Sequence, residues 1–148
     1  MSNTSDALIL SRPLYGANFG QAVGRFFRKY ATFTGRASRS EFWWVRLFLV
    51  VLSVVVALPA SLIVGLTSER RFNGTLAYSP VGVAAIVVAI LIAVALLVPE
   101  VALTVRRLHD ANYSGWYYLL GIVPSVGGII ILILTLSSSR PEGGRFDK

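Results

Sequence analysis

The sequence has no cysteine, a single histidine and few charged residues, which make up 14% of its 148 positions. Without cysteine, the chain forms no disulfides, has no thiolate nucleophile and cannot hold zinc or iron–sulfur clusters through cysteine ligands. Soluble domains carry about 25% charged residues. Because 55% of this chain is hydrophobic, the composition excludes an ordinary soluble domain.

Acidic residues are scarcer than basic ones, with 7 Asp and Glu against 14 Lys and Arg, so the net charge is +7. Such an excess can indicate nucleic-acid binding. Here membrane insertion explains it, since Lys and Arg that flank apolar segments keep those ends in the cytoplasm. We therefore expect no nucleic-acid partner. The expected partner is the lipid bilayer, in particular anionic phospholipid.

Three long runs contain no charged residue. They have 20, 18 and 21 residues and cover 47–66, 81–98 and 116–136. A helix that rises about 1.5 Å per residue crosses a hydrocarbon core of about 30 Å in some 20 residues. With their flanking residues, the runs predict spans at about 40–66, 80–106 and 115–136.

The segment before the first run has a different pattern. Apolar residues recur at spacings of three and four from Phe19 to Phe33, and Arg25, Arg28 and Lys29 supply a polar side. This pattern predicts an amphipathic helix over about 18–34 that lies on the membrane surface. The alternative is a short helix packed against protein.

The predicted fold class is an all-α integral membrane protein, with an N-terminal interfacial amphipathic helix and a bundle of three transmembrane helices. A flexible leader is expected over 1–16, the membrane domain over 17–136 and a polar tail over 137–148. Three helices leave much packing surface uncovered, so a homo-oligomer or a membrane-protein partner is expected.

The third run is ambiguous because Gly121, Pro124, Gly127 and Gly128 interrupt it. The distribution of Lys and Arg places the N-terminus in the cytoplasm. Three crossings then leave nine basic residues inside and five outside, whereas a re-entrant hairpin leaves twelve and two. Charge favours the hairpin, but each of its arms would have only about ten residues. On span length we expect three crossings and keep the hairpin as the alternative.

Glu100 is an ionisable residue within the second apolar region. Such residues usually have a partner or a role. Along ideal helices Glu100 lies about 9 Å before Arg106, and Arg46 lies about 7.5 Å beyond Glu41. Because these depths match, we predict an intramembrane ion pair between Arg46 and Glu100. The alternative is a small transporter or channel subunit in which Glu100 binds a proton or cation.

A second candidate site is a basic cytoplasmic face. Guanidinium groups bind phosphate in a bidentate manner, so the arginines that flank the spans could bind anionic lipid or a protein partner. The alternative is that they only anchor the topology, with Glu41 and Asp110 as ion-pair partners. The residues of the predicted face are Arg36, Arg39, Arg106, Arg107, His109 and Asp110.

Catalysis has little support in the sequence. His109 and Asp110 alone cannot make a phosphohydrolase metal site, since such a site needs several His and Asp ligands, so no metal or cofactor is expected. Ser114 could pair with His109 as nucleophile and base, but it is better explained as a helix cap. A membrane enzyme that acts on a lipid headgroup, with His109 as acid or base, remains the second alternative to a non-enzymatic accessory or scaffold protein.

Three motifs stand in a fixed order along the chain. They are Phe33-x-Gly35-Arg36-x-Ser38-Arg39-x-Glu41-Phe42-Trp43, then Arg106-Arg107-Leu108-His109-Asp110 with Ser114-Gly115-Trp116, and finally Glu142-Gly143-x-Arg145-Phe146. Together they resemble the YhaH-like family of small bacterial inner-membrane proteins, a family of unknown function that bears the number eight hundred and five. The likeness covers about residues 19–147 and implies a bacterial inner-membrane location but no activity.

The chain departs from the family pattern at four positions. It has Tyr117 where the family tends to have a second Trp, Gly144 in place of Asn, and Asp147 in place of Gly. Asn112 stands where the family tends to have Gly. Asn tolerates a left-handed backbone better than most residues, so we expect the turn at Asn112 to be kept.

Overall fold

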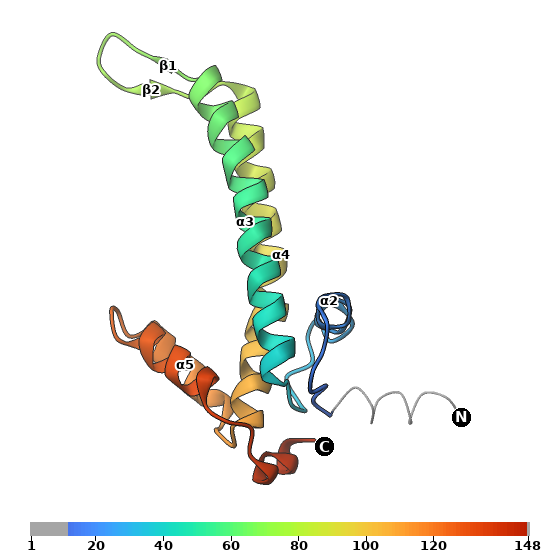
Figure 1. The fold of residues 1–148 in the computed structure, drawn as a ribbon. Coiled ribbons are helices and arrows are strands. Elements are labelled where there is room, and N and C mark those ends of the chain that lie inside the picture. The colour runs from blue at the N-terminus through green and yellow to red at the C-terminus, as the bar shows by residue number, and fades with distance from the viewer. Residues whose placement is uncertain (1–11, 148) are drawn as a thin grey trace. The chain divides into compact units, whose positions relative to one another are not determined.

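The computed structural model describes residues 12–147, which are mainly helical (Figure 1). The chain divides into two compact units. The hairpin unit is Phe48–Leu97, and the terminal unit comprises the residues up to Leu47 together with those from Val98 onward. Helices α3 (Arg39–Thr67) and α4 (Pro80–Asp110) each contribute to both units.

Helix α3 has 29 residues, and Ser38 and Glu41 form a capping box at its start. The backbone N–H of Glu41 donates to Oγ of Ser38 over 3.2 Å, and the N–H of Ser38 donates to Oε2 of Glu41 over 3.0 Å. This reciprocal pair satisfies backbone donors that the first helical turn leaves without partners.

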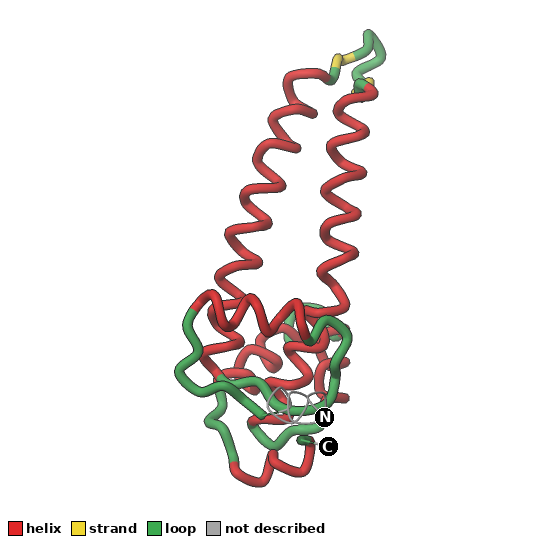
Figure 2. Tube along the Cα trace, turned by 90° about the vertical axis from the view of Figure 1, so that its right-hand side faces the viewer, coloured by secondary structure: helices red, strands yellow, loops and turns green. Residues whose placement is uncertain are grey.

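Helix α4 has 31 residues and begins at Pro80, which needs no backbone N–H at that position. Oγ of Ser79 accepts a bond from the N–H of Gly82 over 3.0 Å. A short antiparallel ladder, β1 (Glu69–Arg70) and β2 (Leu76–Ala77), joins the two helices. Figure 2 shows the two helices of the hairpin unit running side by side.

The hairpin unit exposes its apolar side chains. In the most apolar 18-residue windows of α3 and α4, 0% and 6% of the residues are buried, respectively. By length and composition both helices can cross a membrane, and they are the only two in the described part of the chain that can. An apolar exterior of this kind is what a lipid environment requires. Both helices lie at the first two predicted spans.

The third predicted span is not a continuous helix. Residues 115–136 form a 3₁₀ helix, η1 (Gly115–Ile122), and a ten-residue α-helix, α5 (Gly127–Leu136), which pack against each other. Three crossings are therefore not confirmed. The two arms form a hairpin, and its re-entrant position in a membrane stays a prediction.

The turn of this hairpin explains why the helix breaks. Ser125 follows Pro124 and has a φ of 68°, in the left-handed region. A Cβ at Gly127 would lie 1.9 Å from the carbonyl oxygen of Leu120, so the two arms approach too closely for any side chain there. Gly121 and Gly127, two of the glycines that interrupt this run, permit the close contact between η1 and α5.

Helix α2 (Phe19–Arg28) is shorter than the expected 18–34. Asn18 and Gln21 form a capping box at its start, and Ala22 and Phe26 are buried. The Phe19 ring meets the Trp44 ring edge-on at a centroid distance of 5.9 Å, which holds α2 against the start of α3. Contact of α2 with a membrane surface stays a prediction.

The expected flexible leader lies mostly outside the described residues. Its last part is held by hydrogen bonds: the N–H of Leu14 donates to Oε2 of Glu41 over 3.0 Å, and Oγ of Ser38 donates to the carbonyl of Leu14 over 2.5 Å. The start of α3 is therefore contacted both by α2 and by the chain segment at Leu14.

Candidate functional site at the end of α4

Three segments that are distant in sequence converge on the C-terminal end of α4. The N–H of Gly35 donates to the carbonyl of Phe146 over 2.7 Å, and that of Ala37 to the carbonyl of Arg106 over 3.0 Å. From the tail, the N–H of Arg140 donates to the carbonyl of Asp110 over 2.8 Å. The last carbonyls of a helix lack partners within it, and here neighbouring segments supply donors. The three motifs of the family resemblance therefore form one structural cluster.

The tail is folded where it meets α4. Residues Pro141–Phe146 form the 3₁₀ helix η2. A Cβ at Gly143 would lie 2.4 Å from the carbonyl oxygen of His109, so only glycine fits against the end of α4. Asn112 has a φ of 64°, and the expected left-handed turn is present at that position.

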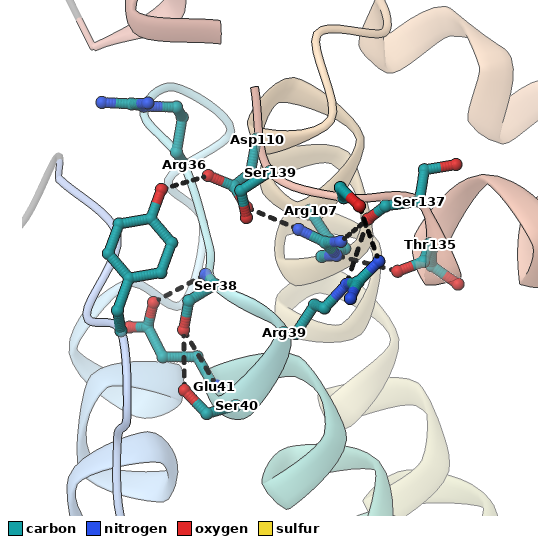
Figure 3. A network of polar contacts seen from close by, with 12 residues as sticks. Arg36, Ser38, Arg39, Ser40, Glu41, Arg107, Asp110, Thr135, Ser137 and Ser139 are labelled. Atoms are coloured by element: carbon teal, nitrogen blue, oxygen red, sulfur yellow. Dashed lines mark hydrogen bonds and ion pairs between the residues drawn. The ribbon is translucent and has the colours of Figure 1, made fainter. Parts of the chain in front are cut away.

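Asp110 is the acceptor at the centre of the cluster (Figure 3). Its side chain is fully buried and accepts a bond of 2.5 Å from Nη1 of Arg107 and one from Oγ of Ser139. The hydroxyl of Tyr15 donates to Oδ1 over 3.2 Å. Burial and the nearby Asp110 charge raise the pKa of Tyr15. With a guanidinium and two hydroxyls as partners, the buried carboxylate is compensated.

Arg107 and Arg39 bind the C-terminal end of α5. Nε of Arg107 donates to the carbonyl of Thr135 over 2.9 Å, and its Nη2 donates to the carbonyl of Ser137. Nη2 of Arg39 donates to the carbonyl of Leu136, and its Nε reaches the Ser137 carbonyl over 3.2 Å. Cations stabilise a helix C-terminus by meeting its unpaired carbonyls and the negative end of its dipole. These two arginines therefore fix the α5 hairpin to the end of α4.

Arg36 is paired with the tail. Its Nε lies 2.9 Å and 3.0 Å from the two carboxylate oxygens of Asp147, and its Nη2 lies 2.6 Å from Oδ2. These bonds raise the pKa of Arg36. Asp147 replaces the glycine that the family tends to have, so this ion pair belongs to the present chain.

His109 is held on two sides. Its Nδ1 lies 3.2 Å from the carbonyl oxygen of Gly35, which only accepts, so Nδ1 carries the proton in this bond. Its ring is parallel to that of Phe146 at a centroid distance of 4.0 Å. The hydroxyl of Ser114 accepts from the N–H of Trp116 over 3.4 Å and caps η1. Ser114 and His109, the candidate nucleophile and base, therefore both have structural partners.

Arg106 does not join this cluster. It is 1% exposed, its Nε donates to the carbonyl of Ala102 over 3.1 Å, and its positive charge acts on Lys29, at the end of α2. The structure thus brings together Arg36, Arg39, Arg107, His109 and Asp110 and separates Arg106 from them. Arg106 and Arg107 are both buried in the terminal unit, and a lipid- or partner-binding role for them stays a prediction.

Arg46 and Glu100 form an ion pair between Nη1 and Oε1. The guanidinium of Arg46 also lies over the Phe42 ring, 5.1 Å from its centroid, and its Nη2 donates to Oγ1 of Thr104 over 3.3 Å. Both charged side chains are about one third exposed, at 33% and 35%. The pairing leaves neither charge isolated in an apolar environment.

Other residues of the cluster were not identified from the sequence. Tyr15, Ser137 and Ser139 contribute through contacts across more than 25 positions, and no local pattern marks such contacts. Arg25, whose Nε binds Glu41, and Lys29 lie outside this cluster; the sequence assigns both to the polar side of α2, but they recur at i and i+4 on the same face as Ala22 and Phe26, and Lys29 is buried. In the described residues, no group of three or more His, Asp or Glu side chains could hold a metal ion.

An exposed groove lies at the start of α3. It is lined by Arg39 and Ser40 at one end and by Trp43, Trp44 and Leu47 along the helix. The two tryptophans are 40% and 39% exposed. The groove therefore combines an exposed cation with an aromatic and apolar floor.

Comparison with known proteins places the chain in a family of unknown function. It is 28% identical over 122 residues to the inner membrane protein YhaH of Escherichia coli, and the aligned region covers 82% of this chain and 89% of YhaH. It is 29% identical over 119 residues to the inner membrane protein YhaI of the same organism, which covers 80% and 86%. No solved structure shows significant similarity. The family model described as "Protein of unknown function (DUF805)" matches residues 30–148, and the chain belongs to this family of membrane proteins.

Proposed function

We propose that the protein is a non-enzymatic accessory protein of the bacterial inner membrane whose cytoplasmic face binds anionic phospholipid. The observation that carries this proposal is the groove at the start of α3. Arg39 can bind a lipid phosphate, Trp43 and Trp44 suit the level of the glycerol and headgroups, and Leu47 continues toward the acyl region.

The bonds of Arg39 are compatible with this role. Nε and Nη2 are used on the end of α5, while Nη1 has no partner among residues 12–147, and the side chain is exposed. A guanidinium has five N–H donors, so the same side chain can hold α5 and a phosphate. Exposed Arg28 and the exposed aromatic residues Phe27, Tyr30 and Phe33 support further contact with the membrane surface.

The charge distribution supports a topology of two crossings with both termini in the cytoplasm. The described residues of the terminal unit include eleven Lys and Arg against five Asp and Glu, a net charge of +6. The hairpin unit has two arginines against one glutamate. Basic residues are retained on the cytoplasmic side, and the tail bonds to the same α4 end as the segment before α3.

The two alternative functions, a small transporter or channel subunit and a membrane enzyme, lack a comparable supporting observation. A transporter would need Glu100 to bind and release a proton or cation, but this carboxylate is engaged by Arg46. An enzyme would need His109 to reach a substrate, but its Nδ1 and one ring face are occupied by Gly35 and Phe146. Both contacts support a structural role for these side chains.

Lipid selectivity at the Arg39 groove can be measured by tryptophan quenching in bilayers. Trp116→Phe leaves only Trp43 and Trp44 as reporters. Brominated phosphatidylglycerol or brominated phosphatidylcholine is then mixed with unlabelled lipid, and the quenching of these two tryptophans measures how well each brominated lipid competes. We expect phosphatidylglycerol to bind about fivefold more tightly than phosphatidylcholine, since a basic residue near an anionic surface contributes about 1 kcal/mol.

The matched variants are Arg39→Gln and Arg71→Gln, which remove the same charge from the two units. Arg39→Gln should bring the ratio of the two lipid affinities close to one, whereas Arg71→Gln should leave this ratio unchanged. Equal binding of both lipids to the parent protein, or equal effects of both variants, would contradict the proposal.

A further inference from the structure

Two buried cationic side chains in the terminal unit have donor atoms without partners. Lys29 is 2% exposed and Arg106 is 1% exposed. Neither Nζ of Lys29 nor Nη2 of Arg106 has a hydrogen-bond partner in the described part of the chain. Buried polar groups are nearly always satisfied, and an unsatisfied charged donor is especially costly. The two unpaired donors, Nζ of Lys29 and Nη2 of Arg106, therefore indicate a shared acceptor.

The two side chains come from different elements. Lys29 is the C-cap of α2 and continues the buried face of Ala22 and Phe26. Arg106 lies one turn before the end of α4, and its carbonyl accepts the N–H of Ala37 over 3.0 Å. Nε of Arg106 is fixed on the Ala102 carbonyl at 3.1 Å, so Nη2 has a defined position.

The nearby carboxylates are already used. Oε1 of Glu41 binds Arg25, and Oε2 accepts the N–H groups of Leu14 and Ser38, each over 3.0 Å. Asp147 is bound in a bidentate manner by Arg36. Neither carboxylate therefore compensates Lys29 through a direct bond.

The charges of this neighbourhood do not balance. Arg25, Lys29, Arg36 and Arg106 are four cations against the two carboxylates of Glu41 and Asp147. Burial and the positive charges of Arg106 and Arg25 lower the pKa of Lys29 to about 7, although Glu41 and Asp147 act in the opposite direction. A buried excess of positive charge is relieved by loss of a proton or by binding of an anion.

We propose that Lys29 and Arg106 form an interior binding site for one phosphate-type oxyanion, separate from the Arg39 groove. A tetrahedral oxyanion accepts bonds from an ammonium and a guanidinium at the same time, and ammonium and guanidinium groups commonly bind phosphate. The anion partners both orphan donors and compensates the excess charge. Its phosphate is either inorganic phosphate or the phosphodiester of a lipid headgroup.

Access to the site requires α2 to move locally. Both donor atoms are screened from solvent, and α2 has only ten residues. Short surface helices are among the elements that open most readily. Anion exchange is therefore expected to be slow relative to exchange at an exposed surface.

The test is thermal unfolding of the full-length protein, first in lipid-free detergent with inorganic phosphate and with chloride at matched ionic strength. A second series uses nanodiscs of phosphatidylcholine with and without phosphatidylglycerol. At tenfold saturation a bound anion should raise Tm by about 4 °C in a chain of this length. Because Lys29 must be protonated to bind, the increase should be larger at pH 6 than at pH 8.

Four variants distinguish this site from others. Lys29→Met and Arg106→Gln should each abolish the anion-dependent increase in Tm, while Arg28→Met, which removes a neighbouring exposed charge, should keep it. Lys29→Met should not impair folding, since it replaces an unpaired buried charge with an apolar side chain. Arg39→Gln should leave this response intact even if the proposed lipid groove fails.

The outcomes separate the possible anions. An increase with inorganic phosphate in detergent that Lys29→Met abolishes identifies free phosphate. An increase only with phosphatidylglycerol, again abolished by Lys29→Met, identifies a lipid phosphate. If neither series shows an increase beyond that of chloride, or if Lys29→Met responds like the parent protein, the proposal is overturned.

Discussion

The imidazole of His109 stacks on the phenyl ring of Phe146, with the two planes inclined by only 4° and the centroids 4.0 Å apart. The guanidinium of Arg145 lies over the Phe146 ring, 4.6 Å from its centroid. Residues at the end of α4 and in the tail thus form one layered contact. Such ring pairs contribute about 0.5–1.5 kcal/mol beyond the burial of their surface.

Replacement of Phe146 by leucine should therefore destabilise the docking of the tail. We expect a loss of about 1 kcal/mol, because the stacking is lost while most apolar surface is kept. A double-mutant cycle with His109→Ala measures the coupling between the two rings through Tm. Strictly additive effects of the two changes would show that the rings do not interact energetically.

Gly143→Ala should be more damaging than Gly144→Ala. A Cβ at Gly143 would approach the carbonyl of His109 to 2.4 Å, whereas a Cβ at Gly144 has its nearest neighbour, Nη2 of Arg36, at 3.9 Å. The first change should displace the tail and cost about 2 kcal/mol or more, within the range of overpacked sites. Limited proteolysis of the tail provides the measurement, and equal cleavage of both variants would contradict this packing.

Glu100→Gln should lower the stability or the yield of the protein, because it leaves the charge of Arg46 without its partner. Breaking a buried pair on one side costs about 3–5 kcal/mol, and a smaller loss is expected here because both side chains are about one third exposed. The double change Arg46→Leu with Glu100→Leu should restore stability. If the double variant is as unstable as Glu100→Gln, the pair is not the reason for the effect.

Without a bound anion, the stability of the protein in phosphate-free detergent should depend on the titration of Lys29. The folded state lowers the pKa of Lys29 from 10.5 to about 7, so the unfolded chain binds more protons between these values. The free energy of unfolding therefore rises with pH from about 7 to 10.5. Lys29→Met should remove this rise, which denaturant titrations at several pH values can measure. The same pH slope in both proteins would show that Lys29 does not titrate in this way.

The topology predicts that the tail lies in the cytoplasm. A reporter active only in the cytoplasm should be active when fused after Lys148, and a reporter active only outside should be inactive there. Fusions placed in the loop between Thr67 and Ser79 should give the opposite result and serve as the control. An active external reporter at the C-terminus would restore the three-crossing topology.

Several features followed from the sequence because they depend on local geometry. The first two spans are long uncharged runs, and their helices occur at the predicted places. The axial rise of a helix makes depth a function of sequence position, which is why Arg46 could be matched with Glu100 before their ion pair was observed. The left-handed backbone at Asn112 was implied by the family resemblance, since the family tends to have Gly there and Asn tolerates this conformation.

The broken third run shows where local reasoning was insufficient. Its glycines and proline indicated both a span and a hairpin, since small residues serve helix contacts as well as turns. The close approach of Gly127 to the Leu120 carbonyl is a contact between two arms of the chain. No count of apolar residues specifies such a contact.

The sequence by itself determined that this basic, cysteine-free chain is a membrane protein and where its first two long apolar helices lie, because these properties are sums over residues and local periods. Only the tertiary structure decided that Arg107 enters the Asp110 cluster, while Arg106 is buried apart from it and its charge acts on Lys29. Consecutive residues on a helix point about 100° apart, and the elements that pack on each side give them different partners. Those elements are brought together by long-range contacts of α2, the segment before α3, and the tail.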